Sequence, residues 1–353
     1  MYISEYVQYF ILLRNMEKNI ETLFIISSPF QAICAYEAIS EFKIESYVFL
    51  VLLTPDDRRK EQIFFFLNTK KIAYEVILLE RISLRRLINS TYLIRKEIEI
   101  RFRRIFIGDY FDKRHLYTAV ILSKPNSGIT FLDDGASSLL VFLRKNPYGF
   151  AYKLKRGLLL FCLDIKRVKH NTFFSLFNIP TNKFRIIHNR LSMFRNDVMM
   201  PQFKIACIIG TYVDEYCASY GIEVEQFLSS FKDILVEFKA EYDTIIFSPH
   251  GRCNNVETIE ICEKLGVEVR YSKISVEYDY LCDKIYPQLI VAFDSTALYT
   301  LKSIFSDSKC INIQFLRKGI SFNDYAEKNA KHLRENYNID TRQVLVDKDD
   351  CKN

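Results

Sequence analysis

The chain has 353 residues, 49% of them hydrophobic and 26% charged, which is the profile of a soluble globular protein long enough for two domains. Only 10 Gly and 8 Pro occur, so long disordered linkers are not expected. The 49 Lys and Arg exceed the 43 Asp and Glu by a net charge of +6, which suits anionic substrates or an anionic membrane surface. No nucleic-acid-binding motif accompanies this modest excess, so nucleic acid is not an expected partner.

The cysteines and the N-terminal segment indicate a cytoplasmic protein. None of the nine cysteines forms a C-x-x-C pair or a zinc-site spacing, so we expect reduced core residues. The apolar patch at residues 6–13 is shorter than the roughly 20 residues that span a bilayer, and it lacks the features of a signal peptide. Met16 is an alternative start, because the first clean strand pattern begins just after it.

Strand and helix patterns alternate through the first part of the chain. Short apolar runs predict strands, and segments with helical spacing lie between them. A basic helical segment follows at 81–104, and it is read as a solvated face or a contact surface for an anionic membrane or acceptor. The predicted strands are 23–27, 47–53, 74–79, 104–107 and 130–132, and the predicted helices are 32–42 and 56–70. The basic segment contains Arg85, Arg86, Arg95, Lys96, Arg101, Arg103 and Arg104.

A second alternating series begins near residue 203. Two such series predict an α/β fold with two Rossmann-like domains, whose parallel sheets face a central cleft. The expected parts are an N-terminal extension at 1–20, a first domain at 21–147, a connecting region at 148–201, a second domain at 202–320 and a tail with helical character at 321–353. The predicted strands here are 204–210, 244–247, 267–271, 289–293 and 310–315, and the helices 223–239, 257–265 and 297–305.

Asp133, Asp134 and Gly135 directly follow the predicted strand at 130–132. Loops at the carboxyl ends of parallel strands bind ligands, so this position favours function. Two adjacent carboxylates raise each other's pKa, which suits a general base. The alternative is an ordinary turn that uses the conformational freedom of Gly135.

His250, Gly251 and Arg252 follow the strand at 244–247 in the same way. An imidazole in this place is suited to hydrogen-bond a leaving phosphate and to act as a general acid, and the fork of Arg252 adds a phosphate contact. The alternative is a surface histidine or a core histidine with its hydrogen bonds satisfied.

Hydroxyl groups and carboxylates follow two further strands. Ser295 and Thr296 open a helix, where they cap its N-terminus and point N–H groups toward an anion. Gly210 and Thr211 precede a pair of acidic residues, Asp214 and Glu215, which are read as a helix cap or as carboxylates facing the crevice. The chain lacks the G-x-G-x-x-G, P-loop and H-E-x-x-H motifs, which argues against a dinucleotide oxidoreductase, a P-loop NTPase and a zincin.

These motifs, in this order, resemble the bacterial sialyltransferases. The resemblance is closest to the lipooligosaccharide sialyltransferase family, glycosyltransferase family 52, which is related to the bacterial polysialyltransferases, and it covers about residues 20–320. It implies a glycosyltransferase-B fold. The motifs that carry it are LFIISSPFQ, LDDGASSLL, CIIGTYVDE, IIFSPHGR, ISVEYDYL and VAFDSTALYTLK.

The resemblance implies an inverting transfer from CMP-Neu5Ac without a metal or other cofactor. The acceptor is a galactose-containing glycan of a bacterial surface polysaccharide or lipooligosaccharide. His250 is the expected acid, and the base is Asp214 or Asp133, with Asp134 and Glu215 left open. The segments that match donor contacts contain Glu277, Tyr278, Asp279, Phe293 and Asp294.

The chain departs from the family pattern in two places. Gly251 stands where a proline or a basic residue is expected, and Asp294 stands where Ser is common. Another CMP-activated sugar such as CMP-Kdo, or a non-catalytic glycan-binding relative, therefore stays open. The acceptor linkage, contact with the inner face of the cell membrane and a homodimeric state are open as well.

Overall fold

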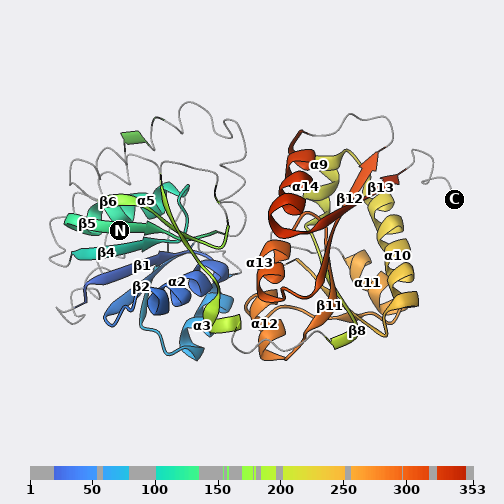
Figure 1. The fold of residues 1–353 in the computed structure, drawn as a ribbon, viewed down its shortest axis with the longest axis horizontal. Helices are drawn as coiled ribbons and strands as arrows, with labels where there is room; N and C mark the ends of the chain where they lie inside the picture. The colour runs from blue at the N-terminus through green and yellow to red at the C-terminus, as the bar shows by residue number, and fades with distance from the viewer. Residues whose placement is uncertain are drawn as a thin grey trace, which may run out of the picture. The chain divides into compact units, whose positions relative to one another are not determined.

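The structure is a computed structural model, and it describes residues 20–53, 59–78, 101–134, 154, 157–158, 169–177, 179, 184–195, 202–250, 256–295, 297–317 and 324–346. The chain divides into two compact units, Met1–Met193 and Phe194–Asn353. Each unit contains its own parallel β-sheet (Figure 1). This is the two-domain α/β architecture that the alternating patterns predicted.

The first unit contains β1 (Thr22–Ile26), α2 (Pro29–Glu41), β2 (Tyr47–Leu53), α3 (Lys60–Thr69), β3 (Tyr74–Leu78), β4 (Phe102–Ile107), α5 (Lys113–Leu122), β5 (Ser123–Phe131), β6 (Lys169–Ser175), β7 (Arg185–His188) and the start of α8 (Ser192–Arg195). The sheet order is β3-β2-β1-β4-β5-β6-β7. The central strands β1 and β2 are continuous apolar runs, because helices cover both faces of a parallel sheet. Figure 1 shows α2 and α3 on one face and α5 on the other.

The second unit contains β8 (Gln202–Ile209), α9 (Val213–Tyr220), α10 (Val224–Glu241), β9 (Thr244–Ser248), α11 (Val256–Lys264), β10 (Glu268–Val269), α12 (Val276–Cys282), β11 (Pro287–Ala292), α13 (Ala297–Ile304), β12 (Lys309–Arg317), α14 (Asp324–Tyr337) and β13 (Asp340–Val346). Its sheet order is β10-β9-β8-β11-β12-β13. Numbered from β8, this is the 3-2-1-4-5-6 order of dinucleotide-binding folds. In Figure 1, α10 and α11 lie on one face and α12 and α13 on the other.

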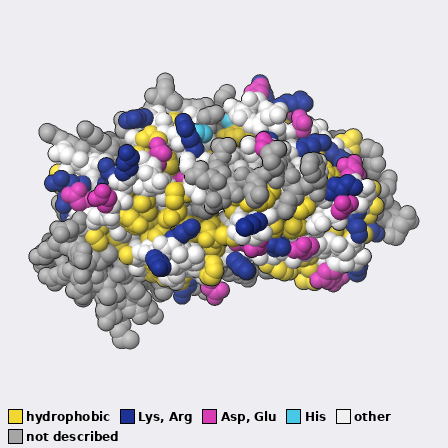
Figure 2. Space-filling view, turned by 60° about the horizontal axis from the view of Figure 1, so that its bottom comes forward, with side chains coloured by type: hydrophobic (Ala, Val, Ile, Leu, Met, Phe, Trp, Pro, Cys, Tyr) yellow, Lys and Arg dark blue, Asp and Glu magenta, His cyan; other side chains and the backbone are white. Residues whose placement is uncertain are grey.

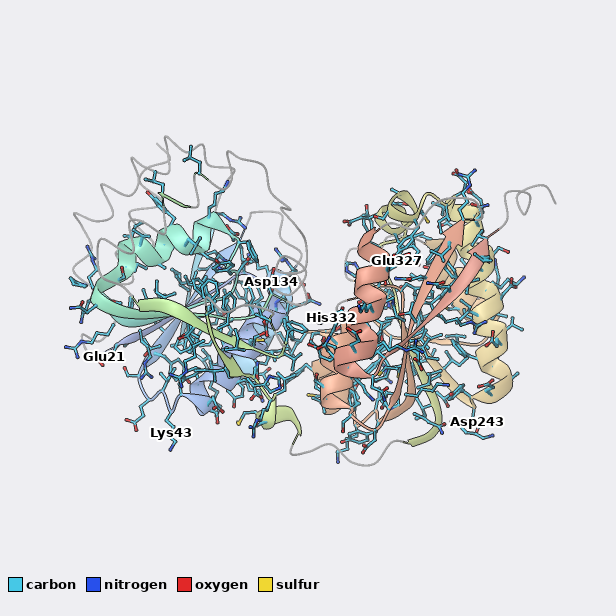
Figure 3. The ribbon with its side chains drawn as sticks, turned by 45° about the horizontal axis from the view of Figure 1, so that its top comes forward. Glu21, Lys43, Asp134, Asp243, Glu327 and His332 are labelled. Atoms are coloured by element: carbon cyan, nitrogen blue, oxygen red, sulfur yellow. The ribbon has the colours of Figure 1, made fainter. Side chains whose placement is uncertain are left out.

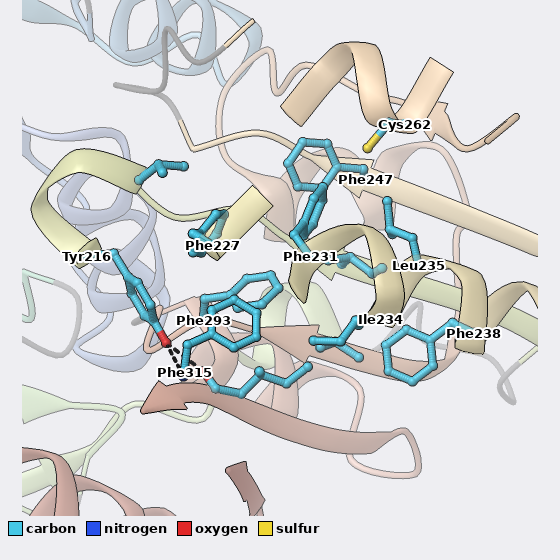
Figure 4. Close-up of a cluster of buried hydrophobic side chains, with 14 of the residues drawn as sticks. Tyr216, Phe227, Phe231, Ile234, Leu235, Phe238, Phe247, Cys262, Phe293 and Phe315 are labelled. Carbon is cyan, nitrogen blue, oxygen red and sulfur yellow. Dashed lines mark hydrogen bonds between the residues drawn. The ribbon is translucent and has the colours of Figure 1, made fainter. Parts of the chain in front are cut away.

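An aromatic core fixes the helices on the first of these faces (Figure 4). The apolar side of α10 presents Phe227, Phe231 and Phe238 at helical spacing, and all three are buried. Phe227 packs 5.6 Å, centroid to centroid, from Phe293, which follows β11. The hydroxyl of Tyr216 accepts a hydrogen bond of 2.9 Å from the N–H of Phe315 and so joins α9 to β12. The ends of β11 and β12 are therefore held rigidly against α9 and α10.

Two of the expected domain limits differ from the structure. The expected connecting region at 148–201 contains β6 and β7, which extend the first sheet. The expected tail at 321–353 contains the helix α14, in agreement with its helical pattern, and also β13, which extends the second sheet. Helices α5, α9 and α12 were not anticipated either. Residues 81–100 of the basic segment lie outside the described part, whereas Arg103 and Arg104 are exposed on the strand β4.

Among the described cysteines, Cys34, Cys207, Cys217, Cys262 and Cys310 are buried and free of disulfide bonds, as expected, and Cys282 is exposed. No helix within the described residues is long and apolar enough to cross a membrane. On the face shown in Figure 2, described Lys and Arg side chains are interspersed with Asp and Glu. The described basic side chains therefore form no continuous stripe on this face.

Candidate active site

Both sheets have a topological switch point at which polar residues gather. In the first sheet β1 lies between β2 and β4, and in the second sheet β8 lies between β9 and β11. At such a point the connections that follow two neighbouring strands run to opposite faces of the sheet. Their loops therefore separate, and a crevice opens at the carboxyl ends of the strands. The polar motifs of the sequence follow β5, β8, β9 and β11, at or next to these points.

In the first unit a hydrogen-bonded cluster joins the ends of β1 and β5. Ser28 caps α2, and its Oγ accepts a hydrogen bond from the N–H of Gln31. The Nε2 of Gln31 donates to Asp134 Oδ1 at 2.7 Å, and Ser28 Oγ donates to the same oxygen at 3.3 Å. Asp134, labelled in Figure 3, is only partly buried. Its carboxylate is held in place by neutral donors and is still accessible.

Asp133 is placed very differently from its neighbour. Its side chain is 0% exposed. Oδ1 accepts a hydrogen bond of 2.7 Å from Ser175 Oγ, and Oδ2 accepts one of 2.6 Å from the N–H of Leu176. Burial raises the pKa of Asp133 to about 7, although the two hydrogen bonds oppose this change. Asp133 therefore fastens the end of β5 to the end of β6, and this burial argues against the expected role of a base that meets an acceptor hydroxyl.

Asp109, which follows β4, is a further carboxyl group that the sequence analysis did not select. Burial, followed by the charge of Asp134, raises its pKa to about 7. Its carboxylate accepts a hydrogen bond of 2.6 Å from the N–H of Phe111, and its own N–H donates to Nδ1 of the buried His115. The signal was present in the sequence, because Gly108-Asp109 follows a strand just as Asp-Asp-Gly does.

In the second unit the ends of β8 and β9 approach each other closely. The N–H of Gly210 donates to the carbonyl oxygen of Ser248 at 2.8 Å. A Cβ atom at Gly210 would lie 3.1 Å from the backbone nitrogen of His250, so glycine permits this approach. His250 is partly buried and lies next to the switch point, as the sequence predicted. Thr211 follows Gly210 and is partly buried as well.

Asp214 and Glu215 lie in the first turn of α9, and both are exposed. Negative side chains at this position interact favourably with the positive end of the helix. Neither residue is the N-cap, which is Tyr212 and makes no side-chain cap hydrogen bond, so the expected cap is not formed by these carboxylates. Their exposure leaves both carboxylates accessible to a substrate.

The end of β11 carries a carboxylate with a constrained backbone. Asp294 has a φ of 49°, in the left-handed region that is uncommon outside glycine. Its Oδ1 accepts hydrogen bonds from Asn312 Nδ2 at 2.6 Å and Gln314 Nε2 at 3.2 Å, and its N–H donates to Asn312 Oδ1. Ser295 Oγ accepts a hydrogen bond of 3.4 Å from the N–H of Ala297 at the start of α13. This contact is in keeping with the expected capping role of Ser295, whereas Thr296, which directly precedes α13, lies outside the described residues.

The three predicted donor contacts on α12 are almost fully buried. Burial raises the pKa of Glu277, whose carboxylate accepts a short hydrogen bond from Thr300 of α13. Burial also raises the pKa of Asp279, which accepts hydrogen bonds from Ser272 Oγ and the N–H of Lys273. Tyr278 donates its N–H to the capping Ser275. These side chains organise α12 and the loop before it, and Phe293 belongs to the aromatic core.

The switch point of the second unit thus brings together Gly210, Thr211, His250, Asp294 and Ser295. The switch point of the first unit gathers Ser28, Gln31 and Asp109, with Asp134 beside them. Gly135, Gly251, Arg252 and Thr296 lie outside the described residues. Within the described ranges, no three His, Cys, Asp or Glu side chains form a group that could hold a metal ion.

Comparisons with known proteins identify the fold. The chain is similar to the glycosyltransferase-B domain of a sialyltransferase from Photobacterium damselae, with a TM-score of 0.53 and 12% identity, over 92% of this chain and 100% of that one. It is similar to a UDP-N-acetylglucosamine 2-epimerase with a TM-score of 0.52 and 12% identity, over 93% of this chain and 85% of that one. No family model matches the sequence. No curated protein matches it either. The protein has a glycosyltransferase-B type of fold.

Proposed function

We propose that the protein is an inverting, metal-independent sialyltransferase that moves sialic acid from CMP-Neu5Ac to a galactose-containing glycan of a bacterial surface polysaccharide or lipooligosaccharide. The observation that carries this proposal is the gathering of Gly210, His250 and Ser295 at the switch point of the second sheet. The sequence motifs and the glycosyltransferase-B fold support the same reading.

The second unit would hold the leaving group. A CMP phosphate at this switch point meets the imidazole of His250, the hydroxyl of Ser295 and the N-terminus of α13, where the positive end of the helix dipole favours an anion. His250 donates a hydrogen bond or proton to the phosphate oxygen as the bond between that oxygen and C2 of the sugar breaks. Arg252 and Thr296 are the further phosphate contacts that the sequence suggests.

A carboxylate is needed to take the proton of the acceptor hydroxyl as its oxygen attacks C2 from the opposite face. Asp134 suits this task, because it is accessible and neutral donors fix one of its oxygens. Asp214 and Glu215, both exposed at the start of α9, remain the candidates of the second unit. The protein's own donors neutralise the leaving phosphate in this scheme, so it requires no metal ion.

The test is release of CMP from CMP-Neu5Ac in the presence of lactose. We expect turnover with the native protein and loss of at least 100-fold in kcat with His250→Ala, since a general acid contributes about 10²–10⁴-fold. His188→Ala, which removes an exposed histidine from β7, is the matched control and should retain activity. Full activity of a folded His250→Ala variant would overturn the role of His250.

Donor identity is tested separately. Thermal unfolding with CMP, UDP and GDP identifies the nucleotide, because a ligand that binds the folded state raises the unfolding temperature. Turnover with CMP-Neu5Ac and CMP-Kdo then distinguishes the sugar. CMP binding without transfer to any acceptor would instead identify a non-catalytic relative and contradict the proposal.

A further inference from the structure

The amide group of Gln31 is oriented by the main chain. Its Oε1 accepts a hydrogen bond of 2.6 Å from the N–H of Ser27, the residue that follows β1. Because a backbone N–H can only donate, the oxygen of the amide must face Ser27, and Nε2 must face the opposite way. Nε2 then donates to Asp134 Oδ1, 103 residues later in the chain. The orientation of Gln31 is thus set independently of Asp134.

Gly108, at the end of β4, leaves the space that this amide occupies. A Cβ atom at position 108 would lie 2.3 Å from Oε1 and 2.6 Å from Cδ of Gln31. These distances are far below van der Waals contact, and Gln31 is only 1% exposed, so the amide has no free volume into which it can turn. The close approach, rather than a special backbone angle, is the reason for glycine here. The ends of β1 and β4 therefore combine to fix one N–H donor, which faces Asp134 after β5.

Helix capping does not account for this arrangement. The N-terminus of α2 is already capped by Ser28, whose Oγ accepts the N–H of Gln31. Asp133 next door supplies the structural contact between β5 and β6. The Nε2 donor of Gln31 is instead directed to the accessible carboxylate of the Asp-Asp-Gly motif.

We propose that Gln31 is a positioning residue for Asp134: supported by Ser27 and Gly108, it holds one carboxylate oxygen and so fixes the rotation of the group that takes the acceptor proton. This inference rests on the proposed function, and it selects Asp134 over Asp214 and Glu215 as the base. The hydrogen bonds from Gln31 and Ser28 also favour the ionised form of Asp134. The neighbouring carboxyl groups of Asp109 and Asp133, which interact with Asp134 by charge, act in the opposite direction.

The kinetic test compares Gln31→Met, which keeps a side chain of similar length but removes the donor, with Gln31→Glu. The glutamate can still accept the N–H of Ser27, but it presents a like charge to Asp134. We expect kcat to fall about 10- to 100-fold, as for other losses of orientation, and the donor KM to stay within about twofold. The acid limb of the pH–rate profile should move to higher pH, further for Gln31→Glu than for Gln31→Met.

The matched control is Gln226→Met. Gln226 is a buried glutamine of the second unit whose amide oxygen accepts the N–H of Glu223 in the capping box of α10. Its replacement should lower the unfolding temperature without moving the pH–rate profile. A profile that stays unchanged in both Gln31 variants, at native kcat, would overturn the inference.

A second measurement does not depend on turnover. In protein labelled with ¹³C at the Asp carboxyl carbon, the Asp134 resonance is assigned by its loss in Asp134→Asn. It should titrate at higher pH in Gln31→Met than in the native protein, because the ionised form has lost a donor. An unchanged titration midpoint would contradict the inference. Absence of sugar transfer by the native protein, with the midpoint shifted, would overturn the proposed reaction but support the contact.

Discussion

At the scale of single residues, the first unit pairs two carboxyl groups of different character. Both are partly buried; the pKa of Asp109 is raised to about 7, whereas Asp134 accepts hydrogen bonds from Gln31 and Ser28. Near neutral pH, Asp109 therefore exchanges its proton. The hydrogen bonds from Gln31 and Ser28 favour the ionised form of Asp134, whereas the neighbouring carboxyl groups oppose it. Carboxyl groups whose environments separate their protonation states are a common arrangement in acid–base sites.

We expect Asp134→Asn to lower the pKa of Asp109. The charge of Asp134 is the second cause of the raised value, so its removal moves the pKa downward, and burial, the larger cause, keeps it above 3.8. The measurement is the ¹³C carboxyl titration of Asp109, assigned through Asp109→Asn. Asp214→Asn, on the other unit's exposed helix end, should leave the titration unchanged. An Asp109 midpoint that is the same in Asp134→Asn and the native protein would show that the two groups do not interact.

The sequence located these residues but could not rank them. Asp133 and Asp134 are identical in type and adjacent, and either fits a base. Successive side chains at the end of a strand point to opposite sides, so one turns toward Ser175 of β6 and the other toward Gln31 of α2. The choice between Asp133 and Asp134 depends on contacts of this turn with β6 and α2. These contacts join residues far apart in the chain, so no local sequence pattern reveals them. Gly108-Asp109 was not selected, although it follows a strand in the same way.

At the scale of elements, Asp133 connects β5 to β6 through a carboxyl group that prefers to be neutral. Its pKa is about 7 in the folded protein and close to 4 in an unfolded chain. The folded state therefore keeps a proton that the unfolded state releases, and the free energy of unfolding falls as pH rises from about 4 to about 7. Below pH 4 both states are protonated, and above pH 7 both are ionised, so the contribution is constant outside this window.

We expect Asp133→Asn to remove this dependence. The amide keeps an acceptor for the N–H of Leu176 and has no charge to bury. Relative to the native protein, the variant should gain stability as pH rises from 4 to 7, by up to about 4 kcal/mol at ~1.4 kcal/mol per pKa unit. Urea unfolding followed by circular dichroism at several pH values measures the difference. Asp243→Asn, at an exposed position before β9, is the control, and a constant difference between Asp133→Asn and the native protein would contradict the argument.

Two of the strands that the sequence failed to predict, β7 and β13, were missed for the same physical reason. β7 and β13 are edge strands of their sheets, and most of their side chains are exposed or half-buried. Edge strands lack the continuous apolar run that identified β1, β2 and β11, so β7 was read as part of a connection and β13 as part of a tail. β6 was missed with them because polar residues surround its paired phenylalanines, Phe173 and Phe174.

At the scale of the whole molecule, the two alternating series were enough to predict two parallel α/β sheets. The prediction succeeded because each βα unit buries its own apolar face, so local patterns carry the global class. The chemistry of the site depends on which strand ends lie at each switch point, and this follows from strand order, which the sequence did not provide. Both sheets share the 3-2-1-4-5-6 order, so each has a switch point where a ligand can bind. We expect the nucleotide in the second unit because His250 and Ser295 follow strands next to its switch point.

The expected position of the nucleotide leads to a prediction about the full chain. CMP should slow amide hydrogen exchange at the ends of β8, β9 and β11 and at the start of α13, because a bound phosphate ties these loops together. The expected peptides contain Gly210, His250 and Ser295, and mass spectrometry measures their exchange with and without CMP. The middle of α10, around the buried Phe231, should exchange at the same rate with and without CMP and serves as the internal control. Protection of the Asp134 peptide with none in the second unit would place the nucleotide at the other switch point and reverse the roles assigned to the two sheets.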